Sequence, residues 1–435
     1  MGKSYRPYYP DAELLLPPSL REWLPQEHLT HFVSDVVDHL DLSAMDAVYG
    51  EEKRGQPPYD PRMMTKLLVY GYCVGVFSSR RIQQRLAEDI AFKVLAAGNE
   101  PNFRTIADFR KTHLKTLAGL FEQVLQIALD AGATKLGRVA LDGTKLKANA
   151  SKHKAMSYDR MQDKEKQLKQ EVQQLLEQAA TADAEEDARY GSRRGDELPE
   201  ELQRRETRLK KIKAAKRALE ARAREKAAAN GEEPNRAKPA DKDQYNFTDP
   251  ESRIMKGADG FVQAYNAQAA VERDFQLIVR QTVTQATNDK EQLLPMMEVV
   301  EQQSGQRPEE VLADSGYCSE KNLQALESEA DPERRIEGYI ATERLKHDEY
   351  KEPCPRGPLP KGATRVDRMR RKLKTKAGKA VYAARKAIVE PVFGQIKQAR
   401  GFRQFLLRGL DKVRGEWALV CLTHNILKLY RLCYE

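Results

Sequence analysis

Apolar residues recur at three- and four-residue spacing through the first third of the chain, after a start that is rich in proline and tyrosine. Such spacing places the apolar side chains on one face of a helix. We therefore predict an extended arm over 1–26 and an all-α domain over 27–134. Gly98 is expected to end the third helix. The four helical segments are HLTHFVSDVVDHLDL, PRMMTKLLVYGYCVGVF, SSRRIQQRLAEDIAFKVLAAG and TIADFRKTHLKTLAGLFEQVLQIALDAG.

A short run of apolar and β-branched residues at 138–141 predicts a strand, after which the chain departs into a long charged segment, 156–235. Glu, Lys, Arg, Gln and Ala dominate this segment, and YGSRRGDELP interrupts it. Apolar residues keep approximate heptad spacing on both sides of the interruption: Met161, Leu168, Val172, Leu175 and Ala179, then Leu202, Leu209, Ile212 and Leu219. The pattern predicts an antiparallel α-helical hairpin, inserted after the first strand.

Strand signatures return after the insertion. Runs at 260–272 and 275–286 are separated by a short polar step, which predicts a β-hairpin. A helix beginning at Asn288 or Asp289 should then lead to another strand at 310–313. Paired strands followed by alternating helices and strands indicate an α/β fold, a mixed sheet flanked by helices. The end of the chain, from about 379, is helical again.

Charge is distributed unevenly over the 435 residues. The formal net charge is +9, but within 361–415 alone 17 basic residues stand against three acidic ones. That local excess of 14 leaves the rest of the chain negative by 5 charges. A basic block in a mildly acidic protein predicts a surface for a polyanion. The alternative for 355–378 is a solvated, partly disordered linker.

Cysteine usage and hydropathy point to the cytoplasm. The five cysteines form no CxxC pair, which predicts reduced thiols. The first residues, MGKSYRPYYPDAE, do not resemble a signal peptide. No apolar run is long enough to cross a bilayer, so we expect no membrane association.

Three carboxylates are the candidates for chemistry. Asp142 and Asp314 each follow a predicted buried strand, and Glu390 lies in a basic helical segment. Carboxylates gathered in one site repel each other unless cations neutralise them, and hard oxygen ligands suit Mg²⁺ or Mn²⁺. Two such ions bound by carboxylates cleave and transfer phosphodiesters. The alternative for each Asp is an ordinary turn or cap residue. Pro391 should kink the helix unless Glu390 stands at its start.

Several basic residues could contact phosphates. Lys145 and Lys147 follow Asp142, and Lys397 lies seven residues after Glu390, on the same face of an ideal helix. In the N-terminal domain, a helix that begins with three arginines resembles the DNA-contacting part of a helix-turn-helix. An all-α packing domain with solvated arginines explains that pattern equally well. The three arginines are Arg80, Arg81 and Arg85.

Taken together, these segments resemble bacterial insertion-sequence transposases of the DDE class. The blocks that carry the resemblance span about 12–430 and include YDPRMMTKLLVYGY, VALDGTKLKANAS, LADSGYCSEKNL and RKAIVEPVFGQIKQARGFRQFLLRGL. The resemblance implies an RNase H-like catalytic domain formed by 135–155 and 236–435, and an N-terminal domain that binds DNA. It also implies that Asp142, Asp314 and Glu390 are the catalytic, metal-binding residues.

The same resemblance implies further DNA-contacting residues in the C-terminal segment: Tyr382, Arg385, Lys386, Lys397 and Arg400. Four residues separate Arg385 from Glu390 where related families often have three, so Lys386 is an alternative for the arginine. The implied reaction uses two Mg²⁺ ions, which Mn²⁺ can replace. The enzyme binds the inverted repeats at the element ends as a homodimer, cleaves them and transfers the 3′-hydroxyls to target DNA. The alternatives are a catalytically silent DNA-binding protein and a nuclease without strand transfer.

Overall fold

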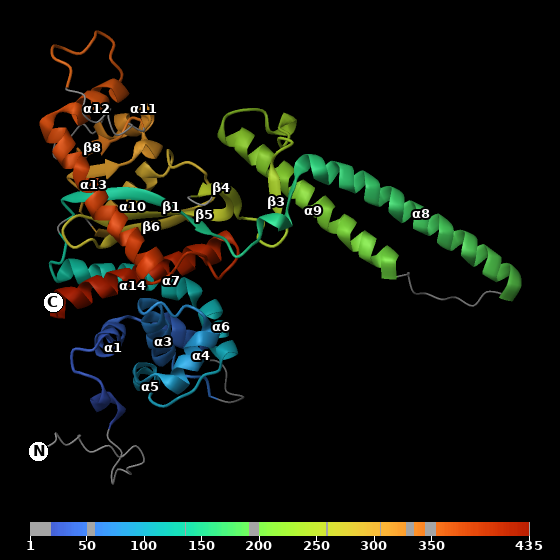
Figure 1. Cartoon of the computed structure of the whole chain (residues 1–435), viewed down its shortest axis with the longest axis horizontal. Helices are drawn as coiled ribbons and strands as arrows, with labels where there is room; N and C mark the ends of the chain where they lie inside the picture. Colours follow the sequence, from blue (N-terminus) through green and yellow to red (C-terminus); the bar gives the residue numbers. More distant parts are fainter. Residues whose placement is uncertain are drawn as a thin grey trace, which may run out of the picture.

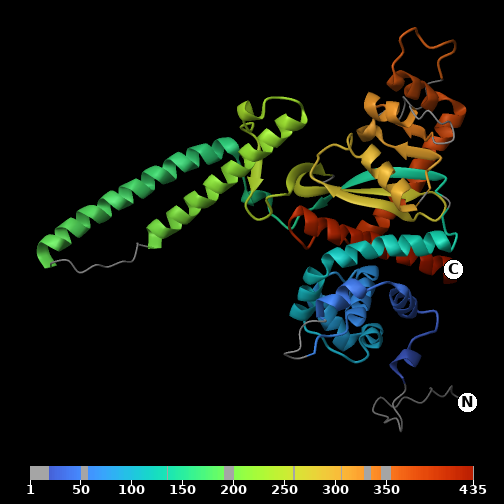
Figure 2. The same ribbon diagram turned by 180° about the vertical axis from the view of Figure 1, so that it is seen from behind.

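The computed structural model describes residues 19–49, 57–134, 136–190, 200–257, 260–304, 306–327, 335–343 and 354–434. Most of the predicted arm, 1–18, lies outside them, and a single 3₁₀ turn (Leu20–Trp23) follows. The described chain has three visible parts: an N-terminal group of helices, a sheet with helices around it, and a long helical pair that extends away from both (Figures 1 and 2). The five cysteines are all free.

The N-terminal part is helical, as predicted, but contains more breaks than the sequence pattern indicates. The predicted third helix divides at Asp89, whose extended backbone and side chain cap a new helix by accepting the N–H of Ala91 at 2.9 Å. The predicted fourth helix divides at His113. The helices are α1 (Leu29–His39), α2 (Ser43–Tyr49), α3 (Pro61–Cys73), α4 (Ser79–Glu88), α5 (Ile90–Ala96), α6 (Phe103–Thr112) and α7 (Leu114–Asp130).

A six-stranded mixed sheet forms the centre of the molecule. Its central strand is β1 (Arg138–Lys147), which pairs antiparallel with β5 (Gly260–Glu272) and parallel with β7 (Glu310–Ala313). Beyond β7 lies the parallel strand β8 (Glu337–Ile340). The other edge of β5 pairs with β4 (Arg253–Gly257) and then, along the second half of β5, with β6 (Ile278–Thr284). The predicted β5–β6 hairpin is therefore present.

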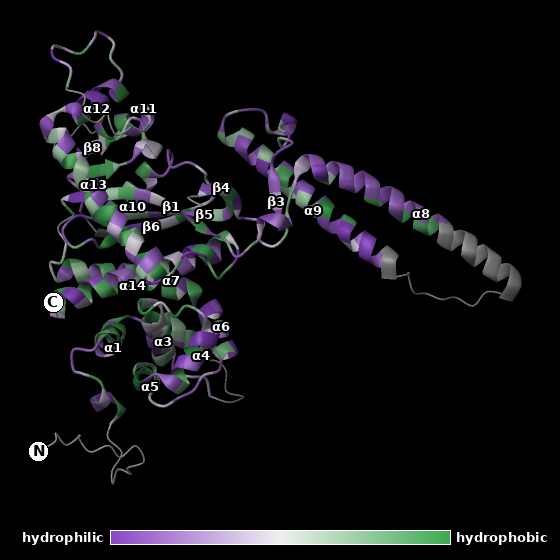
Figure 3. Cartoon of the chain, viewed as in Figure 1, coloured by the Kyte–Doolittle hydropathy of each residue, from purple (hydrophilic) through white to green (hydrophobic). Residues whose placement is uncertain are grey.

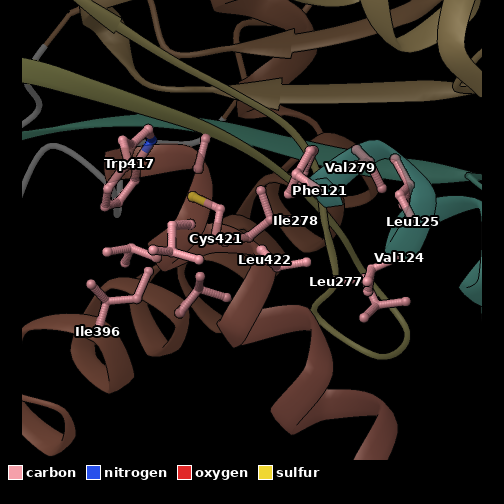
Figure 4. Packing of buried hydrophobic residues seen from close by; sticks show 14 of the residues in the cluster. Phe121, Val124, Leu125, Leu277, Ile278, Val279, Ile396, Trp417, Cys421 and Leu422 are labelled. Atoms are coloured by element: carbon pink, nitrogen blue, oxygen red, sulfur yellow. The ribbon is translucent and has the colours of Figure 1, made fainter. Parts of the chain in front are cut away.

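Helices near the C-terminus cover the sheet. α13 (Lys376–Gly394) crosses β1, β5, β7 and β8, while α14 (Leu410–Tyr434) packs along β6 and against α7 (Figure 1). Figure 4 shows the apolar contact between these elements, with Trp417 and Cys421 of α14 near Ile278 of β6 and Phe121 of α7. All four side chains are buried. The remaining helices here are α10 (Leu293–Ser304), α11 (Glu320–Glu327) and α12 (Arg365–Lys374).

The basic segment 355–378 is not a disordered linker where the structure describes it. A capping box between Thr364 and Asp367 starts α12, and Met369 is buried. The helix α13 also continues through Pro391 instead of ending or beginning there. Proline has no N–H for the carbonyl of Ala387, and the side-chain amide of Gln276 donates to that carbonyl at 2.9 Å. Glu390 thus lies inside the helix and not at its start, and Gln276, in the turn between β5 and β6, supplies the donor that Pro391 lacks.

The charged insertion forms two antiparallel helices, α8 (Tyr158–Tyr190) and α9 (Glu200–Ala229). Figure 3 shows that their surface is mostly hydrophilic. They share a small core of their own, and a two-stranded sheet of β2 (Ala155–Ser157) and β3 (Gln244–Asn246) lies at their base. The core residues are Tyr158, Met161, Leu168, Ile212, Ala215 and Leu219. Among the helices that the structure describes, none is long and apolar enough to span a membrane.

Candidate active site

The sheet brings Asp142 and Asp314 side by side. The parallel pairing of β1 with β7 ends at Leu141 and Ala313, so the two aspartates are the next residues on neighbouring strands, about 5 Å apart in backbone. Asp314 ends its strand as predicted and caps the following turn by accepting the N–H of Gly316 at 2.9 Å. Asp142 does not end its strand, because β5 continues to pair with β1 as far as Lys147.

The environment of Asp142 disfavours its negative charge. Burial raises the pKa of this carboxyl from 3.8 to about 6; Arg385 lowers it and the neighbouring Asp314 raises it further. Nη1 of Arg385 donates to Oδ2 of Asp142 at 3.1 Å, and both side chains are largely buried. A desolvated carboxylate with a second carboxylate and one cation beside it has the electrostatic character of a cation-binding site.

Two cations of the α13 region face this pair. Arg385 is one. The second is the half-buried Lys397, whose pKa is lowered by burial, an effect that Asp142 opposes. Lys386, the alternative to Arg385, is exposed, and Tyr382 is half-buried one turn before Arg385. Of the two candidates for the cationic partner, the structure therefore places Arg385 against Asp142.

Glu390 is not gathered with the aspartates. It follows Arg385 by five residues, about 140° around the helix, and its side chain is exposed. We expected Lys397 to lie on the same helix face as Glu390. Glu390 is exposed but Lys397 is half-buried, because a π-helical turn (Gln395–Ala399) changes the helical phase between the two residues. Within the described parts of the chain, no group of three or more His, Cys, Asp or Glu side chains is arranged to hold a metal ion. The structure brings together two of the three predicted acids.

A third acid, Asp289, lies close to the pair on the loop between β6 and α10. Its Oδ1 accepts from the amides of Asn266 and Gln268, both at 2.6 Å, and lies 3.5 Å from the ammonium of Lys145. We predicted a helix starting at Asn288 or Asp289, but α10 begins only at Leu293. The polar residues Asn266 and Gln268, which stand among the alanines of β5 and are fully buried, were the signal that could have pointed to Asp289.

The other residues predicted to contact DNA differ in the solvent exposure of their side chains. Lys147 is exposed, whereas Lys145 is committed to Asp289. On α4 the three arginines are exposed on the side away from the buried Ile82 and Leu86, and the guanidinium of Arg80 lies 4.9 Å from the ring centroid of Phe103. All three are thus accessible to a ligand: Arg80, Arg81 and Arg85.

Arg400 cannot contact DNA in this structure. Its guanidinium is buried beneath α14, where it donates to the carbonyl of Val420 at 3.2 Å and to the hydroxyl of Thr423 at 2.8 Å. Burial lowers its pKa to about 10, so it stays charged at neutral pH. The prediction that Arg400 binds DNA is wrong for this conformation, because the residue ties the segment after α13 to α14.

Two segments of the chain match known families. Residues 18–112 match a family described as "Transposase domain (DUF772)", and residues 360–430 match one described as "Transposase DDE domain". The two matches support a DDE-type insertion-sequence transposase. The second match contains Arg385, Glu390 and Lys397, while Asp142 and Asp314 lie outside both matches. No curated protein and no solved structure matches the chain.

Proposed function

We propose that this transposase binds the terminal inverted repeats of its insertion sequence, cleaves the DNA at those ends and joins the freed 3′-hydroxyls to target DNA. The observation that carries the proposal is the pair of neighbouring aspartates at the end of the β1–β7 pairing, of which Asp142 is largely buried. The strand order β6-β5-β1-β7-β8, antiparallel up to β1 and parallel after it, supports an RNase H-like catalytic domain over 135–155 and 236–435.

The donor set fits a divalent cation in part. Asp142 and Asp314 offer only carboxylate oxygens, the ligands that Mg²⁺ and Mn²⁺ prefer, and the raised pKa of Asp142 reflects a site short of positive charge. Asp142 and Asp314 would hold the metal, with Glu390 proposed as the third ligand. Two Mg²⁺ ions, or Mn²⁺ in their place, would supply the activation of the attacking oxygen and the stabilisation of the leaving oxygen.

The surrounding cations of the protein would orient the DNA. Arg385 and Lys397 lie beside Asp142, where they can bind the phosphates that flank the scissile bond and hold it for in-line attack. Tyr382 and Lys386 on the same helix, and Lys147 on β1, would extend this phosphate contact. Each is at least partly accessible.

Recognition of the repeats would fall to the helical domain 27–134, through the exposed arginines of α4, and to the basic block 361–415. Both element ends have to be processed together, so we propose a homodimer on DNA. The hairpin segment 156–235 is a candidate contact between its subunits. The compartment would be the bacterial cytoplasm, where the DNA lies.

A strand-transfer reaction tests the proposal. The full chain is mixed with a labelled repeat-end duplex, a supercoiled plasmid and Mg²⁺, and the products are separated on gels. Joined products are expected, and they should disappear in Asp142→Ala, Asp314→Ala and Glu390→Ala variants that still bind the duplex. Nicks without joining would indicate a nuclease, and a gel shift without cleavage would indicate a DNA-binding protein. Either result would overturn the proposal.

A further inference from the structure

Asp289 fills the space between the two segments that carry the aspartates. A Cβ atom added to Gly143, the residue after Asp142, would collide with the side-chain amide of Gln268 and lie 3.0 Å from Oδ1 of Asp289. A Cβ atom added to Gly316, two residues after Asp314, would lie 2.9 Å from Oδ1 of Asp314 and 3.2 Å from Oδ2 of Asp289. Each aspartate is therefore followed by a glycine, and one oxygen of Asp289 lies close to each glycine.

The carboxylate of Asp289 is held firmly in that position. Two buried amides of β5, from Asn266 and Gln268, donate to its Oδ1, and Lys145 of β1 is its ionic partner. Gln268 is fixed in turn, because the hydroxyl of the buried Tyr317 donates to its Oε1. Tyr317 follows Asp314 by three residues, so the network reaches the turn after β7 as well as β1 and β5. A fully bonded polar network of this kind holds its members in one arrangement.

The network lies on the other face of the sheet from the side chain of Asp142. Side chains alternate along a strand, so Gly143 and Lys145 face away from Asp142. The register agrees, since Gly143 pairs with Gln268 and Lys145 with Asn266. Arg385 of α13 contacts Asp142 on the opposite face. Asp289 therefore supports β1 from the face opposite to the side chain of Asp142.

We infer that Asp289 is a positioning residue that sets the spacing of Asp142 and Asp314, and through it their affinity for a divalent cation. The inference rests on the proposed function, in which those two aspartates hold the metal. Partners outside the ligand shell typically change metal affinity by about 10- to 100-fold when they are removed. Asp289→Ala should weaken metal binding by at least about tenfold, and Asp289→Asn, which keeps an acceptor for the two amides, should weaken it less.

The test is a titration of the DNA-free full chain with Mn²⁺, in which free Mn²⁺ is counted by electron paramagnetic resonance. Asp411→Asn is the matched control, because this carboxylate is almost fully exposed at the start of α14 and should leave the affinity unchanged. Wild-type affinity in Asp289→Ala would overturn the inference. So would a lower unfolding temperature with unchanged Mn²⁺ affinity, since that result would make the role of Asp289 purely structural.

Two further variants complete the design. If Asp289→Ala shows no cooperative unfolding transition, Gly316→Ala decides, because its added methyl group would press on Asp289 and Asp314 without removing a charge. Weaker Mn²⁺ binding is expected there too, and unchanged binding refutes the inference. Asp142→Asn distinguishes a failure of the proposed metal site from a failure of the inference about Asp289. If wild type binds no Mn²⁺, or Asp142→Asn binds it as tightly, the proposed metal site fails and the inference with it. If only the Asp289 variants behave like wild type, the inference alone fails.

Discussion

Replacing Asp142 by Asn should stabilise the metal-free protein while it abolishes cleavage. At pH 7 the native carboxylate is ionised in a site that raises its pKa from 3.8 to about 6. A shift of about two pKa units corresponds to roughly 3 kcal/mol at about 1.4 kcal/mol per unit. The interaction with Arg385 is already part of that shift, and an Asn amide oxygen can still accept from Arg385. The net gain should therefore be up to about 3 kcal/mol.

The sign of the pH dependence follows from the same shift. Between about pH 4 and pH 6 the folded protein holds a proton on Asp142 that the unfolded chain has already released. The stability of wild type therefore falls as the pH rises through this window and remains at the lower level above it. Asp142→Asn has no such titration. Its advantage over wild type should be largest at pH 7 and should shrink towards pH 4.

Thermal unfolding in the presence of EDTA measures this difference. Asp142→Asn should unfold roughly 2–6 °C above wild type at pH 7, with a smaller gap at pH 5. Asp411→Asn, which removes an almost fully exposed carboxylate, should match wild type at both pH values. Mn²⁺ should raise the midpoint of wild type but not that of Asp142→Asn. A variant no more stable than wild type at pH 7, or a gap that does not change with pH, would refute the reasoning.

Three other substitutions have distinct expected outcomes. Glu390→Gln should lower cleavage by about 100-fold or more but change stability by less than about 0.5 kcal/mol, because the side chain is exposed; cleavage and thermal unfolding of the same preparation check this. Replacing Arg80, Arg81 and Arg85 together by Ala should reduce the slope of log affinity against log salt concentration for repeat-end binding, by the equivalent of up to about three phosphate contacts. A gel-shift series at several salt concentrations measures this slope. An unchanged slope would mean that α4 packs in the domain without contacting DNA. Arg400→Ala should destabilise the fold by about 2–4 kcal/mol in urea unfolding, while the folded fraction binds repeat ends normally.

The sequence predicted the sheet part of the site well because strand periodicity and strand ends are local signals. The apolar runs before Asp142 and Asp314 identified β1 and β7, and parallel neighbours in a sheet bring their carboxyl ends together. The β5–β6 hairpin followed from a short polar step. Neither conclusion needs knowledge of side-chain packing elsewhere in the chain.

The helical part was less predictable, because a helix presents a residue according to its phase and to what it packs on. The π-helical turn after Gly394 changes the phase, so Lys397 lies near Asp142 while Glu390 is exposed. Pro391 stays within α13, and Gln276, more than a hundred residues away, donates to the carbonyl that it leaves free. Arg400 is charged and lies in a basic block, yet its hydrogen-bond partners are in α14.

The sheet fixes the two aspartates, whereas helix phase places Glu390, and this difference bears on how the site would be completed. Backbone pairing fixes Asp142 and Asp314, and the Asp289 network supports them from the opposite face, so the aspartate pair exists without metal or DNA. Glu390 lies on α13 beside the buried Val389, and its own side chain is exposed. A cation bound between the aspartates would offset both the burial and the repulsion by Asp314 that raise the pKa of Asp142, and its positive charge could attract Glu390. In the proposed function, the sheet would therefore bind the cation first, and the glutamate would respond to a charge already present.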